Sequence, residues 1–132
     1  MNKWILAAGL ISFITLGAHV FAGGPEVHDT MLGLAGAFPP MLRTLISVMW
    51  HAITVTLAIN SAALLLAARH ILLRKALVWF VCCQYMAFAA LFVFYDLNQL
   101  GSLLLLPQWI VFILISGLAA AGLRTSPEAL RA

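Results

Sequence analysis

The sequence predicts an all-α, polytopic membrane protein, a bundle of four transmembrane helices with short loops. Hydrophobic residues make up 64% of the 132-residue chain and charged residues 8%, whereas a soluble domain is about a quarter charged. Mean hydropathy is +1.09. The apolar residues form four runs without the period-two alternation of barrel strands, each close to the ~20 residues that cross a bilayer. Soluble enzymes and nucleic-acid-binding modules are therefore excluded, and residues 1–132 are expected to form a single transmembrane domain.

Glycine and proline separate the first two runs. The first covers about residues 4–22, and we expect it to stop at Gly23-Gly24-Pro25, because these residue types disfavour a continuing helix. Lys3 and the apolar stretch after it also resemble a secretory signal, but we interpret the run as a retained helix. The second run covers about residues 42–68 and follows Pro39-Pro40, since proline suits the first turn of a helix.

Polar residues separate the remaining runs. The third covers about residues 76–95 and follows a basic break formed by Arg69-His70 and Arg74-Lys75. The fourth covers about residues 103–123 and follows Asp96, Asn98 and Gly101-Ser102. Residues 124–132 are expected to form a short tail.

The distribution of basic residues predicts the orientation. Six of the seven Lys and Arg residues fall at the N-terminus, in the middle loop or in the tail: Lys3, Arg69, Arg74, Lys75, Arg124 and Arg131. The first loop holds only Arg43. Because basic residues gather on the cytoplasmic side of membrane helices, we expect an inner-membrane protein with both termini and the tail in the cytoplasm. The first and third loops then face outward.

Small and hydroxylated residues form a stripe on each of the first two helices. Spacings of three and four place one set on a single face of the second helix: Thr44, Ser47, His51, Thr54, Ala58 and Ser61. The first helix carries Ala8, Ser12, Thr15 and His19 in the same way. Helix packing accounts for the small and hydroxylated positions. It does not account for a histidine on each stripe, and an ionisable residue within a membrane indicates function.

These histidines belong to a polar layer in the outer half of the predicted bundle. The candidate ligand-binding residues of this layer are His19, His51, Asp96, Gln108, Tyr95 and Glu26. We predict that His19 and His51 face one polar cavity, because an unpaired imidazole in lipid is costly. Asp96 or Gln108 is expected to border that cavity.

Three classes of function remain open. The first is an auxiliary or binding protein that binds or conducts a small solute or ion in the outer polar layer. The second is a metal site made by His19, His51 and His28, or a haem site that uses His19 and His51 as axial ligands. The third is a purely structural subunit of a larger membrane complex.

The sequence lacks the common motifs of metal sites and of catalytic sites. The chain has no H-x-x-x-H, H-E-x-x-H or C-x-x-C spacing, so metal ligands would have to converge from separate segments. It also has no G-x-S-x-G or P-loop motif, so an enzyme is not the favoured interpretation. The expected partners are the lipid bilayer and either further copies of the chain or a larger membrane complex. No nucleic acid is expected.

Overall fold

The computed structural model describes residues 1–125, which form helices and contain no strand. Along the chain the elements are α1 (Lys3–Ala18), η1 (His19–Asp29), α2 (Thr30–Leu34), η2 (Ala35–Ala37), α3 (Pro40–Arg69), α4 (Ile71–Tyr95), η3 (Asp96–Leu100) and α5 (Gln108–Arg124). The predicted tail, residues 124–132, lies outside the described residues from position 126 onward. The all-α class and the four-helix bundle are confirmed.

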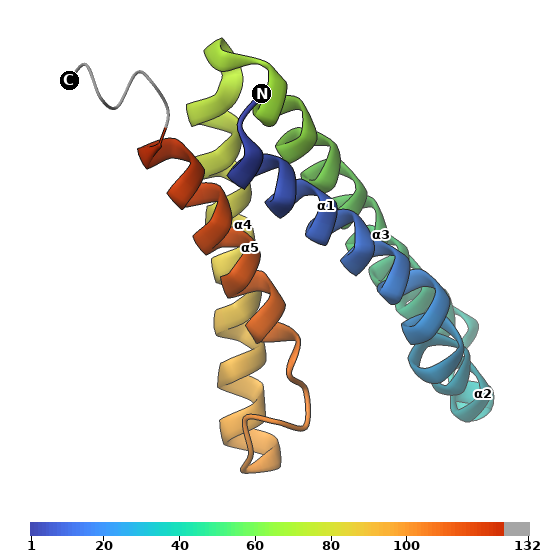
Figure 1. Cartoon of the computed structure of the whole chain (residues 1–132). Coiled ribbons are helices and arrows are strands. Elements are labelled where there is room, and N and C mark those ends of the chain that lie inside the picture. The colour runs from blue at the N-terminus through green and yellow to red at the C-terminus, as the bar shows by residue number, and fades with distance from the viewer. Residues whose placement is uncertain (126–132) are drawn as a thin grey trace.

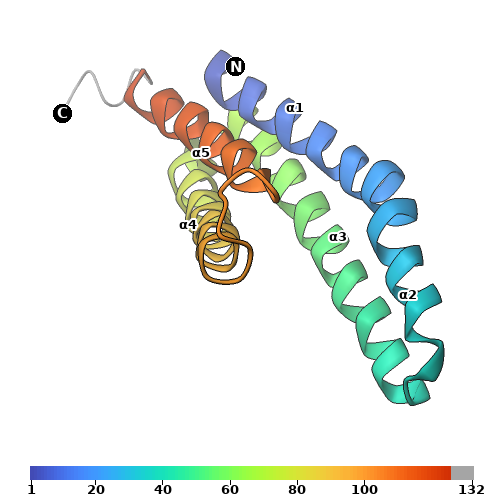
Figure 2. The same cartoon turned by 90° about the horizontal axis from the view of Figure 1, so that it is seen from below.

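The four long helices form two antiparallel pairs, α1 with α3 and α4 with α5 (Figure 1). The pairs meet at one end, which carries Asn2, His70 and Arg124 and is called the closed end here. They diverge toward the other end, the open end, which carries η2 and residues 101–107 (Figure 2). Three helical segments are long and apolar enough to cross a membrane: Lys3–Ala37, Pro40–Arg69 and Ile71–Leu100. The apolar helix α5 is shorter.

The buried core lies where all four long helices meet. Its members are apolar side chains from each of them: Ile5, Ala8, Leu57, Leu64, Ala67, Ala68, Val78, Val81, Cys82, Tyr85, Ala89, Phe112, Ile115 and Ala119. Small residues allow close approach between the helices, since a Cβ on Gly122 would overlap the side chain of Ile5. The Phe112 ring packs against the ring of Tyr85 at a centroid distance of 5.2 Å.

Polar contacts join the helices at the closed end. The side chain of Asn2 caps α1 by accepting hydrogen bonds from the backbone of Trp4 and Ile5. Its amide also donates to the carbonyl of Gly122 at 2.7 Å, and its backbone N–H donates to the carbonyl of Ala68 at 2.8 Å. The start of α1 is therefore tied to the ends of α3 and α5.

The break between the second and third helices is shorter than predicted. Only His70 separates α3 from α4, and Arg74 lies in the first turn of α4 instead of in a loop. Arg74 is buried, and its guanidinium donates to the carbonyls of Ala67 at 3.1 Å and Ala68 at 3.4 Å. Because the last carbonyls of a helix have no partner within it, Arg74 satisfies the end of α3 while it belongs to α4.

The expected stop at Gly23-Gly24-Pro25 was wrong. The helix continues through these residues as the wide π-helical segment η1 and then as α2. Gly23 lies against the indole of Trp50, where an added Cβ would lie 3.1 Å from Cη2. The glycine therefore provides close approach between η1 and α3 rather than a break. π-Helical turns are often found at functional sites.

The fourth helix begins later than predicted. Residues 101–107 form an irregular loop, and α5 starts only at Gln108. Gly101 begins the loop with φ 65°, a left-handed conformation that favours glycine. The indole of Trp109 donates to the carbonyl of Leu103 at 2.9 Å and thereby holds the loop against α5. The 17 residues of α5 rise about 26 Å at 1.5 Å per residue, slightly less than the ~30 Å hydrocarbon core.

Candidate functional site at the open end

Two histidines pack against the indole of Trp50 where η1 meets α3, and a third histidine contacts one of them. His19 stacks on Trp50 with ring centroids 4.1 Å apart and an interplanar angle of 16°. His28 lies 5.5 Å from Trp50 and 5.5 Å from His51, the latter edge-on at 89°. We call His19, His28, Trp50 and His51 the histidine–tryptophan cluster. It brings together residues from two segments that are far apart in the sequence.

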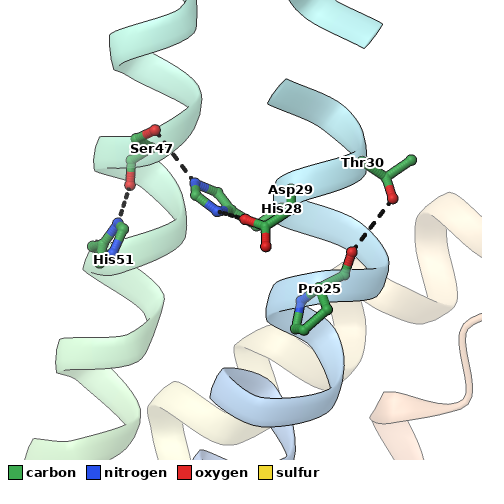
Figure 3. Close-up of polar contacts among 6 residues, drawn as sticks. All are labelled: Pro25, His28, Asp29, Thr30, Ser47 and His51. Atoms are coloured by element: carbon green, nitrogen blue, oxygen red, sulfur yellow. Dashed lines mark hydrogen bonds and ion pairs between the residues drawn. The ribbon is translucent and has the colours of Figure 1, made fainter. Parts of the chain in front are cut away.

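Hydrogen bonds determine which ring nitrogens carry hydrogens (Figure 3). His51 Nδ1 lies 2.7 Å from the backbone carbonyl of Ser47. A carbonyl only accepts, so Nδ1 is the donor and Nε2 of neutral His51 keeps a free lone pair. His28 Nδ1 lies 3.1 Å from the carboxylate of Asp29, which also only accepts. His28 Nε2 faces the hydroxyl of Ser47 at 3.3 Å.

The cluster is partly enclosed. The side chain of His28 is 12% exposed, whereas that of Asp29 is 69% exposed. His19 Nε2 is buried and has no hydrogen-bond partner among residues 1–125. His51 is exposed. The site therefore combines one buried imidazole nitrogen with a second imidazole that is open to the surroundings.

A shallow groove of about 300 Å³ adjoins the cluster. It lies where α2 meets the first turns of α3, and Leu32, Pro40, Arg43, Thr44 and Ser47 line it. Ser47 belongs to both features, because it lines the groove and its hydroxyl contacts His28. The hydroxyl of Thr44 donates to the carbonyl of Pro40 at 3.0 Å.

Only part of the predicted polar layer comes together. Glu26 is exposed on η1, the same segment as His28. Tyr95, Asp96 and Gln108 belong to the α4–α5 pair, which diverges from the α1–α3 pair at this end (Figures 1 and 2). Asp96 and Gln108 are thus on the other helix pair from His19 and His51, and their place beside the two histidines stays a prediction.

The three residues on the α4–α5 pair differ in environment. Asp96 is fully buried, and neither carboxylate oxygen has a hydrogen-bond partner among residues 1–125. Tyr95 is exposed, and its ring contacts Phe94 edge-on at 5.4 Å. Gln108 is exposed at the start of α5. These residues lie toward the open end, as the cluster does, but on the other helix pair.

Within residues 1–125, no group of three or more His, Cys, Asp or Glu side chains is arranged to hold a metal ion. His19 and His28 contact Trp50, and His28 also contacts His51, but this arrangement is not a three-ligand set. The haem hypothesis for His19 and His51 stays a prediction.

A second polar group lies inside the core, and the sequence analysis did not identify it as a unit. Ser12 on α1 bonds to Ser61 on α3 at 2.8 Å and also to the hydroxyl of Tyr85 on α4. All three side chains are buried, as is that of Asn60, which precedes Ser61 in the sequence. Ser12 and Ser61 were visible as members of the two stripes. Tyr85 carried no comparable signal, because it sits in an apolar run on another helix.

No family model, curated protein or solved structure matches this chain. The helical fold and the residues at the open end therefore carry the functional argument.

Proposed function

We propose that this chain is a small inner-membrane protein that binds a small polar solute or ion at the histidine–tryptophan cluster. The observation that carries the proposal is the grouping of three imidazoles, in which His19 and His28 pack on Trp50 and His51 contacts His28. In this group His19 Nε2 is buried and unpartnered among residues 1–125. A buried polar atom without a partner is costly, and a bound solute, ion or water removes that cost. Histidine also titrates near neutral pH, which suits exchange of protons.

The charge distribution supports an outward-facing cluster. The segments that meet at the closed end carry five basic residues: Lys3, Arg69, Arg74, Lys75 and Arg124. Arg43 lies near the open end. The closed end, which carries Asn2 and Arg124, is then cytoplasmic. His51 lies 18 residues before Arg69, or about 27 Å along α3, and this depth is close to the far boundary of a ~30 Å hydrocarbon core. The cluster would therefore be reached from outside.

Protons are a direct probe of this site. We would prepare one variant that keeps only Trp50 and a matched one that keeps only Trp4, with phenylalanine at the other tryptophans. In proteoliposomes, acidifying the outside should change the Trp50 fluorescence at once, because a protonated imidazole places a cation against the indole face. Trp4 lies near the closed end and should respond only after a protonophore is added. An unresponsive Trp50, or equal responses from both, would refute the proposal.

The subunit alternative is favoured by a separate observation, the divergence of the two helix pairs (Figure 1). Large apolar side chains stay exposed on both pairs, among them Val48, Met49, Phe80 and Phe94. Lipid, a second copy or another membrane subunit would cover them. Extraction in a mild detergent separates these cases. Co-purification of a larger protein in a fixed ratio to this chain would favour an auxiliary subunit. Recovery of the chain alone would favour an independent binding protein.

A further inference from the structure

We propose that the groove beside the cluster binds a phosphate-type oxyanion, and that His28 takes up a proton when the anion binds. This inference rests on the proposed function, because it names the chemical class of the solute that the open end recognises. The groove is about 300 Å³, and its polar lining comes from Arg43, Thr44 and Ser47.

Arg43 provides the positive charge. Its side chain is exposed and makes no hydrogen bond or ion pair with any of residues 1–125. A guanidinium presents a rigid fork of N–H donors that matches the oxygens of a phosphate group. Arg43 lies 26 residues before Arg69 on α3, or about 39 Å along the axis, so it reaches the headgroup layer of a membrane ~40–45 Å thick. Lipid phosphates and dissolved anions are both present at that level.

Ser47 becomes a second donor only when His28 is protonated. Nδ1 of His28 already carries a hydrogen, which it donates to Asp29. In neutral His28, Nε2 therefore accepts the hydrogen of the Ser47 hydroxyl. When Nε2 gains a proton from solvent, it donates to Ser47 instead, and the Ser47 hydrogen is free to bond an anion in the groove. The Thr44 hydroxyl is not available as a further donor to the anion, because it donates its hydrogen to the carbonyl of Pro40.

Charged and titratable groups surround His28. Its own segment carries Glu26 and Asp29, and Asp29 bonds to the His28 ring. The facing helix α3 carries Arg43 and His51, and His51 contacts the His28 ring, while His19 packs on Trp50. The sequence of α2 contains no titratable residue. A bound anion offsets the charge of Arg43, so anion binding and proton uptake reinforce each other. The affinity should therefore rise as the pH falls.

The test uses the full-length protein in phosphate-free maltoside micelles and sodium sulfate as the probe. Calorimetry should show saturable binding that is several-fold tighter at about pH 6 than at about pH 8, where histidine loses its proton. Arg43→Gln should weaken binding by about tenfold or more at both pH values, because a charge-assisted hydrogen bond is lost. The affinity of Arg43→Lys should lie between those of the wild-type protein and Arg43→Gln, since lysine keeps the charge but not the forked N–H donors. His28→Gln should remove most of the pH dependence, because glutamine does not titrate and neither His19 nor His51 bonds to Ser47 through its side-chain hydroxyl.

Two further arms identify the source of the anion. Short-chain phosphatidylglycerol is added as competitor, with diacylglycerol as the phosphate-free control. Competition by the phospholipid alone supports a lipid headgroup, and sulfate binding without competition supports a dissolved anion. Absence of both sulfate and phospholipid binding would overturn the inference, as would binding that Arg43→Gln leaves unchanged. If Trp50 still responds to external acid in that case, the inference fails while the proposed function stands.

Discussion

The buried hydroxyls of Ser12, Ser61 and Tyr85 form a chain with a single direction, and this direction predicts unequal effects of two substitutions. The hydroxyl of Ser61 donates to the carbonyl of Leu57 at 2.7 Å. Ser61 must therefore accept from Ser12, because its only hydrogen is used. Ser12 in turn must accept from Tyr85. These hydrogen-bonded hydroxyls join α1, α3 and α4 within the core.

Tyr85→Phe removes only the last donor in this chain. Ser12 keeps its bond to Ser61, so the expected loss is about 0.6 kcal/mol, the mean for one interhelical hydrogen bond in a membrane protein. Ser12→Ala removes both bonds made by Ser12, and the Tyr85 O–H must turn to Ser61 or Asn60, the other polar side chains beside it. Each lost hydrogen bond costs about 0.5–1.5 kcal/mol, so the expected loss for two bonds is about 2 kcal/mol.

The double variant provides the decisive comparison. Both single variants lose the same bond between Ser12 and Tyr85, so the loss in the double variant should be smaller than the sum of the two single losses. The free energy of unfolding would be measured by titrating sodium dodecyl sulfate into dodecylmaltoside micelles and following helical circular dichroism. The reasoning is refuted if Tyr85→Phe costs as much as Ser12→Ala, or if the two losses add in the double variant.

Two further substitutions, each with a control substitution, test the packing and the hydrogen bonds at the closed end. Gly122→Ala should lower stability by about 1–3 kcal/mol through overpacking, since its Cβ would overlap Ile5. Gly117→Ala, which has open space around it, should stay within about 0.5 kcal/mol in the same unfolding assay, and equal losses would contradict the packing argument. Arg74→Ala should cost about 2 kcal/mol, because two charge-assisted bonds to the end of α3 disappear. The exposed neighbour Lys75→Ala should again stay within about 0.5 kcal/mol, and a loss as large as that of Arg74→Ala would show that the bonds are unimportant.

Local pattern predicted much of the helical architecture. Each of the four predicted runs overlaps a helix of the structure, and α3 begins at Pro40 as proline at a helix start predicts. The sequence was less reliable at the boundaries. Gly23 and Pro25 indicate a break by residue type, yet η1 continues through them. The difference arises from packing against Trp50, which no pattern within residues 19–29 records.

For the site, the sequence by itself determined the chemistry of the residues and their placement along each helix. Spacing of three and four put Ser47 and His51 on one face of α3, and the structure bonds them directly. Only the tertiary structure decided which faces meet. His28, predicted from its residue type alone, joins His51 because η1 stays helical, while Asp96 lies away from the cluster because the α4–α5 pair diverges. Periodicity within a helix follows from backbone geometry, whereas the angle between helix pairs depends on contacts between residues far apart in the chain.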